Sequence, residues 1–105
     1  MGANASPNAS PNVDTVGDIK LHEPNKYHVI FMNDDYTPMD FVISILVDIF
    51  LHTNDTANEL TQLIHDKGKA VVGTYTHEVA EQKAIESTAM ARSAGHPLNV
   101  TVEPE

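Results

Sequence analysis

The order of apolar and polar residues along the chain predicts alternating strands and helices from about residue 26 onward. The segment Tyr27-His28-Val29-Ile30-Phe31-Met32 is rich in β-forming residues and continuously apolar after its histidine. This pattern is typical of a central strand that is covered on at least one face. The strand is expected to end at Asn33-Asp34-Asp35, because these residue types favour turns and local hydrogen bonds to the backbone.

The following segment predicts a helix that begins at Pro38. Thr37 has the chemistry of an N-cap, proline suits the first helical position, and the next carboxylate lies near the positive end of the helix dipole. Polar residues recur at every fourth position among apolar ones, as Asp40, Ser44, Asp48 and His52. Only this narrow polar stripe can face water, so most of the helix surface must be covered by other elements. The pattern therefore indicates that this is the core helix.

A second helix is predicted after the polar break Thr53-Asn54-Asp55, which supplies capping residues. Its apolar positions keep helical spacing at Ala57, Leu60, Leu63 and Ile64, and it is expected to end at Lys67 and Gly68. The next segment, Ala70 to Tyr75, is β-rich and predicts a second strand.

The C-terminal part predicts a third helix and a last strand. Thr76 is the expected cap of the helix, and Gly95 and Pro97 are expected to stop it. Apolar Leu98, Val100 and Val102 alternate with polar neighbours, the period of a half-buried strand. The order strand, helix, helix, strand, helix, strand predicts a compact α+β domain with a three-stranded antiparallel sheet and three helices.

Residues 1 to 25 differ in composition from the rest of the chain. Asn-Ala-Ser-Pro is repeated at positions 4–7 and 8–11, and large apolar side chains are scarce. Such a segment cannot bury enough surface to offset the entropy of ordering. We therefore expect a disordered N-terminal tail over residues 1–25 and a core domain over residues 26–105. Composition alone leaves open whether the tail is an inert leader or has a function.

Charge and composition narrow the function. With 105 residues the chain fits one small domain, and its net charge of −9 with only 6 lysines and arginines argues against nucleic-acid binding. An acidic surface suits a cationic ligand. No cysteine is present, so disulfides and thiolate sites are excluded. No secretory signal or stretch of about 20 apolar residues is evident, so a cytoplasmic protein is expected.

Several side chains together predict a pocket for an ammonium group. Asn33, Asp34, Asp35 and His65 offer hydrogen-bond acceptors to a cation, and apolar side chains such as Met39, Ile64 and Leu98 offer a wall beside it. A free amino terminus that carries a bulky apolar first residue has this shape. Each signal alone has a plainer interpretation, as a turn, a surface histidine or a core position.

The combination of these segments resembles the ClpS family of bacterial protease adaptors. The resemblance rests on Lys26-Tyr27, the run from Asn33 to Val42, His65, Gly68-Lys69-Ala70, Glu78-Val79-Ala80-Glu81 and His96-Pro97-Leu98, and it extends from Lys26 to Glu103. It implies a monomeric adaptor, without enzymatic activity, cofactor or metal, that binds N-end-rule substrates. Such an adaptor delivers proteins that begin with Leu, Phe, Tyr or Trp to the ClpA unfoldase and its ClpP protease.

The same resemblance implies roles for individual residues. The substrate ammonium would be bound by Asn33, Asp34, Asp35 and His65, and Met39 would act as a gate. The pocket for the first side chain would be completed by Met32, Thr37, Val42, Thr61, Ile64 and Leu98. Thr61 departs from the pattern, since a larger apolar residue is expected there. Glu78 and Lys83 would contact the N-terminal domain of the unfoldase, and the tail would be a handle that the unfoldase engages.

Two other classes of protein share part of this pattern. Asp34, Asp35 and His65 could suggest a hydrolase, but no serine nucleophile in a suitable context, metal-binding histidine pair or phosphate loop is evident. A protein-interaction domain like the C-terminal domain of the ribosomal stalk protein would explain the fold. Such a domain would not need an ammonium-binding pocket.

Overall fold

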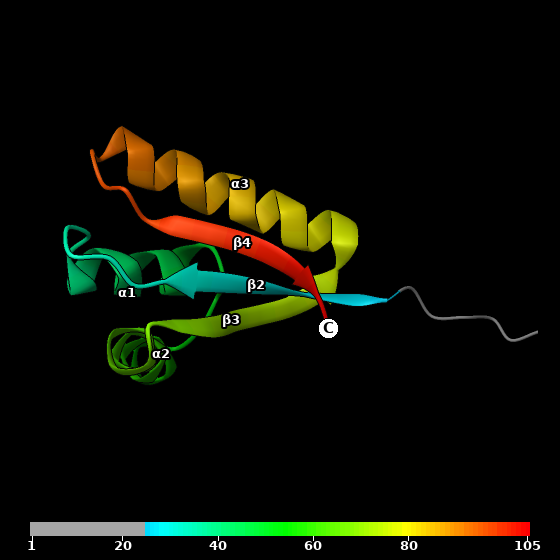
Figure 1. Cartoon of the computed structure of the whole chain (residues 1–105), viewed down its shortest axis with the longest axis horizontal. Helices are drawn as coiled ribbons and strands as arrows, with labels where there is room; N and C mark the ends of the chain where they lie inside the picture. The colour runs from blue at the N-terminus through cyan, green and yellow to red at the C-terminus, as the bar shows by residue number, and fades with distance from the viewer. Residues whose placement is uncertain (1–24) are drawn as a thin grey trace, which may run out of the picture.

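The computed structural model describes residues 25–105, which form three strands and three helices (Figure 1). In chain order the elements are β2 (Lys26–Met32), α1 (Met39–Asp48), α2 (Asn54–Lys67), β3 (Lys69–Thr76), α3 (His77–Ser93) and β4 (Asn99–Pro104). This order confirms the predicted α+β class. The predicted N-terminal tail lies outside the described residues, apart from residue 25. No helix within residues 25–105 is long and apolar enough to cross a membrane.

The three strands form one antiparallel sheet in the order β3-β2-β4. The central position of β2 follows from its sequence, because Val29, Ile30 and Phe31 are all buried. Phe31 pairs with Ala70 on β3 and with Val100 on β4. Both neighbours therefore hold the end of β2, from which the site described below begins.

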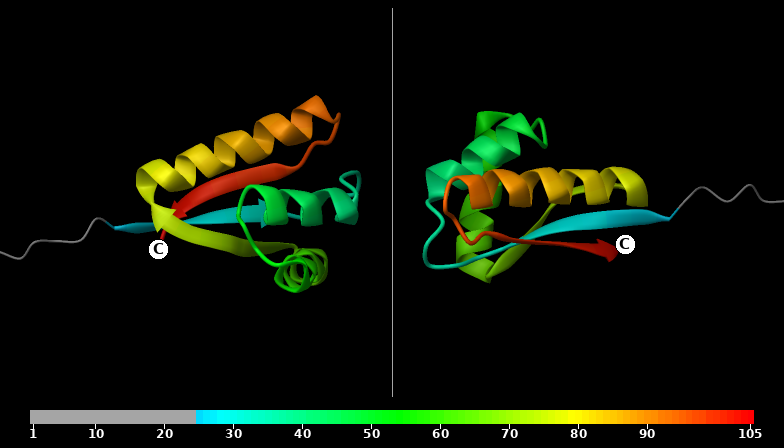
Figure 2. Two further views of the ribbon diagram at one scale, coloured as in Figure 1. Left: turned by 180° about the vertical axis from the view of Figure 1, so that it is seen from behind. Right: turned by 90° about the horizontal axis from the view of Figure 1, so that it is seen from above.

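The core lies between the sheet and the helices that pack on it. Figure 2 (right) shows α1 and α3 on the same side of the sheet. Helix α1 contributes Val42, Ile45 and Leu46, and helix α3 contacts all three strands. The aromatic rings of Phe31 and Phe50 meet edge to face, with 5.4 Å between their centroids. These contacts confirm that the first helix is the core helix.

The start of α1 differs from the prediction. The helix begins at Met39, and Pro38 rather than Thr37 occupies the N-cap position. The carbonyl of Pro38 accepts from the backbone N–H groups of Phe41 and Val42, at 3.1 and 3.2 Å. The Thr37 hydroxyl does not cap the helix, because it donates to the carboxylate of Asp34 instead.

The end of α1 also comes earlier than its polar stripe predicted. The helix ends at Asp48, and Leu51 then adopts a left-handed backbone conformation with φ of 61°. His52 therefore lies outside the helix, and its ring nitrogen Nε2 is 2.6 Å from the carbonyl oxygen of Val72 on β3. The prediction that His52 continues a water-facing stripe was wrong, because tertiary contact with β3 takes up its imidazole.

The ends of the other two helices mostly follow their expected caps. The hydroxyl of Thr53 accepts from the backbone N–H of Thr56, and Gly68 closes α2 with φ of 91°. That conformation favours glycine, since a side chain would be strained there. Thr76 occupies the N-cap position of α3, but its side chain makes no capping hydrogen bond.

Candidate functional site

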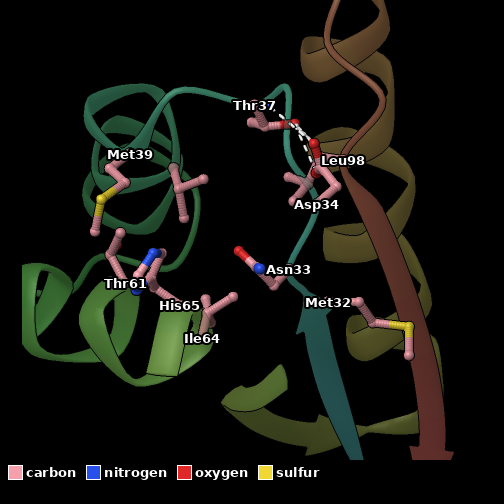
Figure 3. Close-up of a pocket in the computed structure, with 10 residues that line it drawn as sticks. Met32, Asn33, Asp34, Thr37, Met39, Thr61, Ile64, His65 and Leu98 are labelled. Carbon is pink, nitrogen blue, oxygen red and sulfur yellow. Dashed lines mark hydrogen bonds between the residues drawn. The ribbon is translucent and has the colours of Figure 1, made fainter. Parts of the chain in front are cut away.

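A cavity lies where β2 ends, between the loop before α1, helix α2 and the segment before β4. It is lined by ten residues, shown in Figure 3: Met32, Asn33, Asp34, Thr37, Met39, Val42, Thr61, Ile64, His65 and Leu98. All ten belong to the predicted set. The remaining predicted residue, Asp35, is exposed and does not line the cavity.

Asn33 is held beside helix α2 by a backbone hydrogen bond. Its N–H donates to the carbonyl oxygen of Gly68 at 2.8 Å, which ties the end of β2 to the end of α2. The left-handed conformation of that glycine turns the chain so that β3 can start at Lys69. Figure 3 shows the side chain of Asn33 projecting toward His65. An amide and an imidazole thus face the same space.

Asp34 organises the loop that leads into α1. Its Oδ1 accepts from the backbone N–H groups of Tyr36 and Thr37, each at 2.8 Å, and its Oδ2 accepts from the Thr37 hydroxyl at 2.8 Å. Burial opposes ionisation, but these hydrogen bonds and the nearby His96 together lower the pKa of the Asp34 carboxyl. The carboxylate is therefore charged near neutral pH, and Oδ2 keeps acceptor capacity for a ligand.

His65 presents its ring from the last turns of α2. Its Nδ1 lies 3.3 Å from Oδ1 of Asp66, which also accepts from Gln62 at 3.0 Å. The hydrogen bonds from Gln62 and His65 lower the pKa of the Asp66 carboxyl. The ionised carboxylate has no proton to donate, so it acts only as a hydrogen-bond acceptor. This contact favours a proton on Nδ1 and leaves Nε2 as an acceptor. Asp66 was not predicted as part of the site, although it directly follows His65 in the sequence.

Apolar side chains form the rest of the wall. Val42, Ile64 and Leu98 are buried, whereas Met39 remains 43% exposed. Leu98 sits in a loop held by Arg92, whose Nη1 donates to the carbonyl oxygens of His96 and Leu98 at 3.0 and 2.9 Å. Arg92 was not predicted as part of the site. Its contacts fix where the apolar wall stands relative to Asn33.

The cavity is small in this structure. The volume open to the centre of a water molecule is about 20 Å³, which is enough for roughly one water. A Leu or Phe side chain needs more room, so a lining side chain must move to admit one. Met39 is the best suited, because it is partly exposed and its thioether chain has several rotatable bonds.

Thr61 is the buried polar residue of the cavity. Its side chain is only 3% exposed, and its Oγ1 has no hydrogen-bond partner among the described residues. Thr61 is the position at which the sequence differs from the ClpS pattern, and the structure shows that this difference buries a hydroxyl group. A hydroxyl stands where an apolar group is expected.

A second surface lies on helix α3, away from the cavity. Glu78, Val79, Gln82, Lys83 and Glu86 line an open groove there. The Lys83 ammonium donates to the carbonyl oxygen of Ile49 at 2.8 Å and lies over the rings of Phe50 and Tyr75. Lys83 therefore also connects α3 to the end of α1, a structural role that its sequence position did not reveal.

Within residues 25–105, the side chains of His, Asp and Glu form no group of three or more that could hold a metal ion. The cavity offers an amide oxygen, a carboxylate and a ring nitrogen next to an apolar wall. All three groups can accept hydrogen bonds from a cationic group.

Comparison with known proteins places the chain in a class of protease adaptors. The family model for the ATP-dependent Clp protease adaptor protein ClpS matches residues 22–101. The ClpS of Deinococcus radiodurans is 40% identical over 99 residues, which cover 94% of this chain and 88% of that protein. The ClpS of Helicobacter hepaticus is 44% identical over 90 residues, covering 86% and 91% respectively.

A solved structure agrees with these relatives. The structure of Agrobacterium tumefaciens ClpS2 bound to L-phenylalaninamide matches with a TM-score of 0.77 at 41% identity, and the match covers 79% of this chain and 100% of that one. The chain belongs to the ClpS family. It is therefore an adaptor of the Clp protease, and this assignment to a family of adaptors agrees with the expectation that it is not an enzyme.

Proposed function

We propose that this adaptor binds substrates by their free amino group and their bulky hydrophobic first residue, and that this first residue is Leu, Phe, Tyr or Trp. The observation that carries the proposal is the meeting of three acceptors, from Asn33, Asp34 and His65, at the mouth of an apolar cavity. An α-ammonium group has three N–H donors, which match three acceptors. The first side chain then extends toward the buried apolar wall.

Magnitudes explain why such a pocket would require a free amino terminus. Each hydrogen bond to a charged group contributes about 1.5–3 kcal/mol. Burial of one Leu or Phe side chain contributes roughly 1.5–3 kcal/mol. Three such bonds outweigh the side-chain contribution, so the ammonium provides most of the affinity. An internal Leu or Phe lacks the ammonium group and so would not form these hydrogen bonds with Asn33, Asp34 and His65.

The ligand of the A. tumefaciens ClpS2 structure supports this proposal. L-phenylalaninamide carries a free α-amino group and an aromatic side chain, and its amide replaces the carboxylate just as a peptide bond does. It therefore has the chemistry of the first residue of a protein chain. Asp35 would act from the protein surface, through water or as a longer-range charge, because it does not line the cavity.

Delivery to the ClpA–ClpP protease is the second half of the proposal. The groove on α3 that includes Glu78 and Lys83 would contact the N-terminal domain of ClpA. It lies on a different element from the residues that line the cavity, so the adaptor can bind a substrate and the unfoldase together. Residues 1–25 would then provide the segment that the unfoldase engages.

Fluorescence anisotropy tests the binding step. A labelled peptide that begins with an unblocked Leu or Phe should bind saturably, and N-acetylation of the same peptide should abolish binding. Asn33→Ala should weaken binding of the free peptide by about tenfold or more, since it removes one bond to a charged group. Equal binding of the free and acetylated peptides would show that the cavity does not recognise an amino terminus.

Degradation of a reporter with an N-terminal Leu tests the delivery step. Glu78→Arg should slow ClpA–ClpP degradation and leave peptide affinity unchanged, because Glu78 lines the α3 groove and not the cavity. Glu81→Arg is the matched control: Glu81 is exposed on the same helix but does not line the groove. If ClpA–ClpP degrades the reporter at the wild-type rate with both variants, the groove is not the unfoldase contact.

A further inference from the structure

The hydroxyl of Thr61 is unusual for a threonine inside a helix. A buried hydroxyl in a helix usually donates to the backbone carbonyl one turn earlier. Ser87 on α3 does so, with its Oγ 2.8 Å from the carbonyl oxygen of Lys83. Thr61 is equally buried within α2, yet its Oγ1 has no partner in the part of the chain that the structure describes. Thr61 lines the cavity, so a ligand that enters the cavity lies beside this side chain.

The other polar groups that line the cavity already have partners or roles. The Thr37 hydroxyl is bound to the carboxylate of Asp34. Asn33, Asp34 and His65 stand at the mouth as acceptors for the substrate ammonium, under the function proposed above. Thr61 is therefore the polar group left to meet the side chain of the first residue.

The position of Thr61 on α2 suits this role. It lies four residues before His65, so the two side chains share one face of the helix about one turn, or roughly 5.4 Å, apart. A ligand with its ammonium at His65 can extend an aromatic side chain along that turn. Ile64, the neighbouring buried residue of α2, lines the same cavity. The far end of an aromatic ring can then reach the hydroxyl.

We infer that Thr61 makes this pocket select tyrosine over phenylalanine as the first residue of a substrate. The inference rests on the function proposed above and concerns the chemistry of the first side chain alone. A phenol can donate to or accept from the Thr61 hydroxyl. Phe and Leu offer nothing to the same group, which stays without a partner when they bind, so only Tyr gains a hydrogen bond.

The test measures dissociation constants of four pairs: peptides that begin with Tyr or Phe, each with the wild-type protein and with Thr61→Val. Valine keeps the shape of threonine and removes the hydroxyl. The wild type should bind the Tyr peptide about 3- to 10-fold more tightly than the Phe peptide, the range of one neutral hydrogen bond. Thr61→Val should lose that preference, and Thr61→Ser should keep it.

Thr101→Val is the matched control. Thr101 on β4 carries the other buried hydroxyl without a partner among residues 25–105, and it does not line the cavity. This substitution should leave the ratio of the two affinities unchanged. Should Thr61→Val fail to fold, Thr61→Ala removes the same hydroxyl with less bulk at the position, and the ratio is measured on that variant.

The outcomes separate this inference from the proposed function. If the wild type binds both peptides only when their amino groups are free, but the Tyr-to-Phe ratio is the same without the hydroxyl, the role of Thr61 is wrong and the proposed function stands. If acetylated peptides bind as well as free ones, the proposed function fails. A preference for Tyr that vanishes in Thr61→Val but persists in Thr61→Ser and Thr101→Val supports the inference.

Discussion

Acidification should weaken substrate binding through the ring of His65. The ring must keep one unprotonated nitrogen to accept from the ammonium, and the contact with Asp66 favours Nε2 for this role. An ordinary imidazole is half protonated near pH ~6.5. Protonation of Nε2 removes the acceptor, so affinity for a peptide with an N-terminal Leu should fall as the pH is lowered from 7.5 to 5.5.

The exposure of the His65 side chain indicates how much affinity its removal should cost near neutral pH. The side chain of His65 is 60% exposed, so its bond to the ammonium should lie at the weak end of the range for charged hydrogen bonds, about 1.5 kcal/mol. His65→Ala should therefore weaken binding about tenfold at pH 7.5. At pH 5.5 the wild type and the variant should bind the peptide almost equally.

Anisotropy titrations at pH 7.5, 6.5 and 5.5 test this prediction on both proteins. The Asp34 carboxylate stays charged throughout, because its pKa is lowered from 3.8. His96 is a second histidine near Asp34, and its ring lies 4.6 Å from that of Phe41. His96 is present in both proteins, so the difference between them isolates His65. A wild type with a flat profile, or a variant with an equally steep one, would refute the reasoning.

Three further predictions follow from the same contacts. Met39→Ala should admit peptides that begin with Val or Ile, since it removes the flexible side chain that crowds a branched Cβ; anisotropy that shows no gain for these peptides would place the gate elsewhere. Removal of residues 2–20 should leave peptide affinity unchanged, because every lining residue lies beyond the cut, whereas ClpA–ClpP degradation of a reporter should slow sharply; full-rate degradation by the shortened protein would contradict the role of the tail. Asp34→Ala should lower the free energy of unfolding by about 1–3 kcal/mol at pH 7. Because folding lowers the pKa of Asp34, the ionised carboxylate stabilises the folded state above pH 3.8, and this stabilisation is lost as pH falls through the folded-state pKa. Denaturant unfolding in which the difference in free energy of unfolding between wild type and variant does not shrink in acid would contradict this.

The sequence predicted the element order because each element has its own periodicity and its own stop signals. The buried run from Val29 to Phe31, Gly68 after α2 and the alternation from Leu98 to Val102 are all local features. The caps were less predictable. Thr37 looked like an N-cap, but the carboxylate of Asp34 competes for its hydroxyl, and that competition depends on how the loop folds.

Tertiary contacts account for the parts of the site that the sequence did not reveal. The carbonyl groups that bind Arg92 and Lys83 are backbone atoms of the loops before β4 and after α1, and no sequence pattern marks such partners. Most of the residues that line the cavity could be anticipated through the resemblance to ClpS, since Asn33, Asp34, Thr37, Met39, Val42, His65 and Leu98 lie within the motifs that carry it. The unpartnered state of the Thr61 hydroxyl could not, because it depends on what surrounds the buried face of α2.

Helix α3 works as a spacer between two surfaces. Its early part carries Glu78 in the groove, and its last turn carries Arg92, which holds the loop of Leu98 at the cavity. Arg92 follows Glu78 by 14 positions (92 − 78), which correspond to about 21 Å along a continuous helix. The separation of the two surfaces is thus set by a rod of fixed length and not by a flexible loop. A partner bound in the groove would therefore lie at a constant distance from a substrate bound in the cavity.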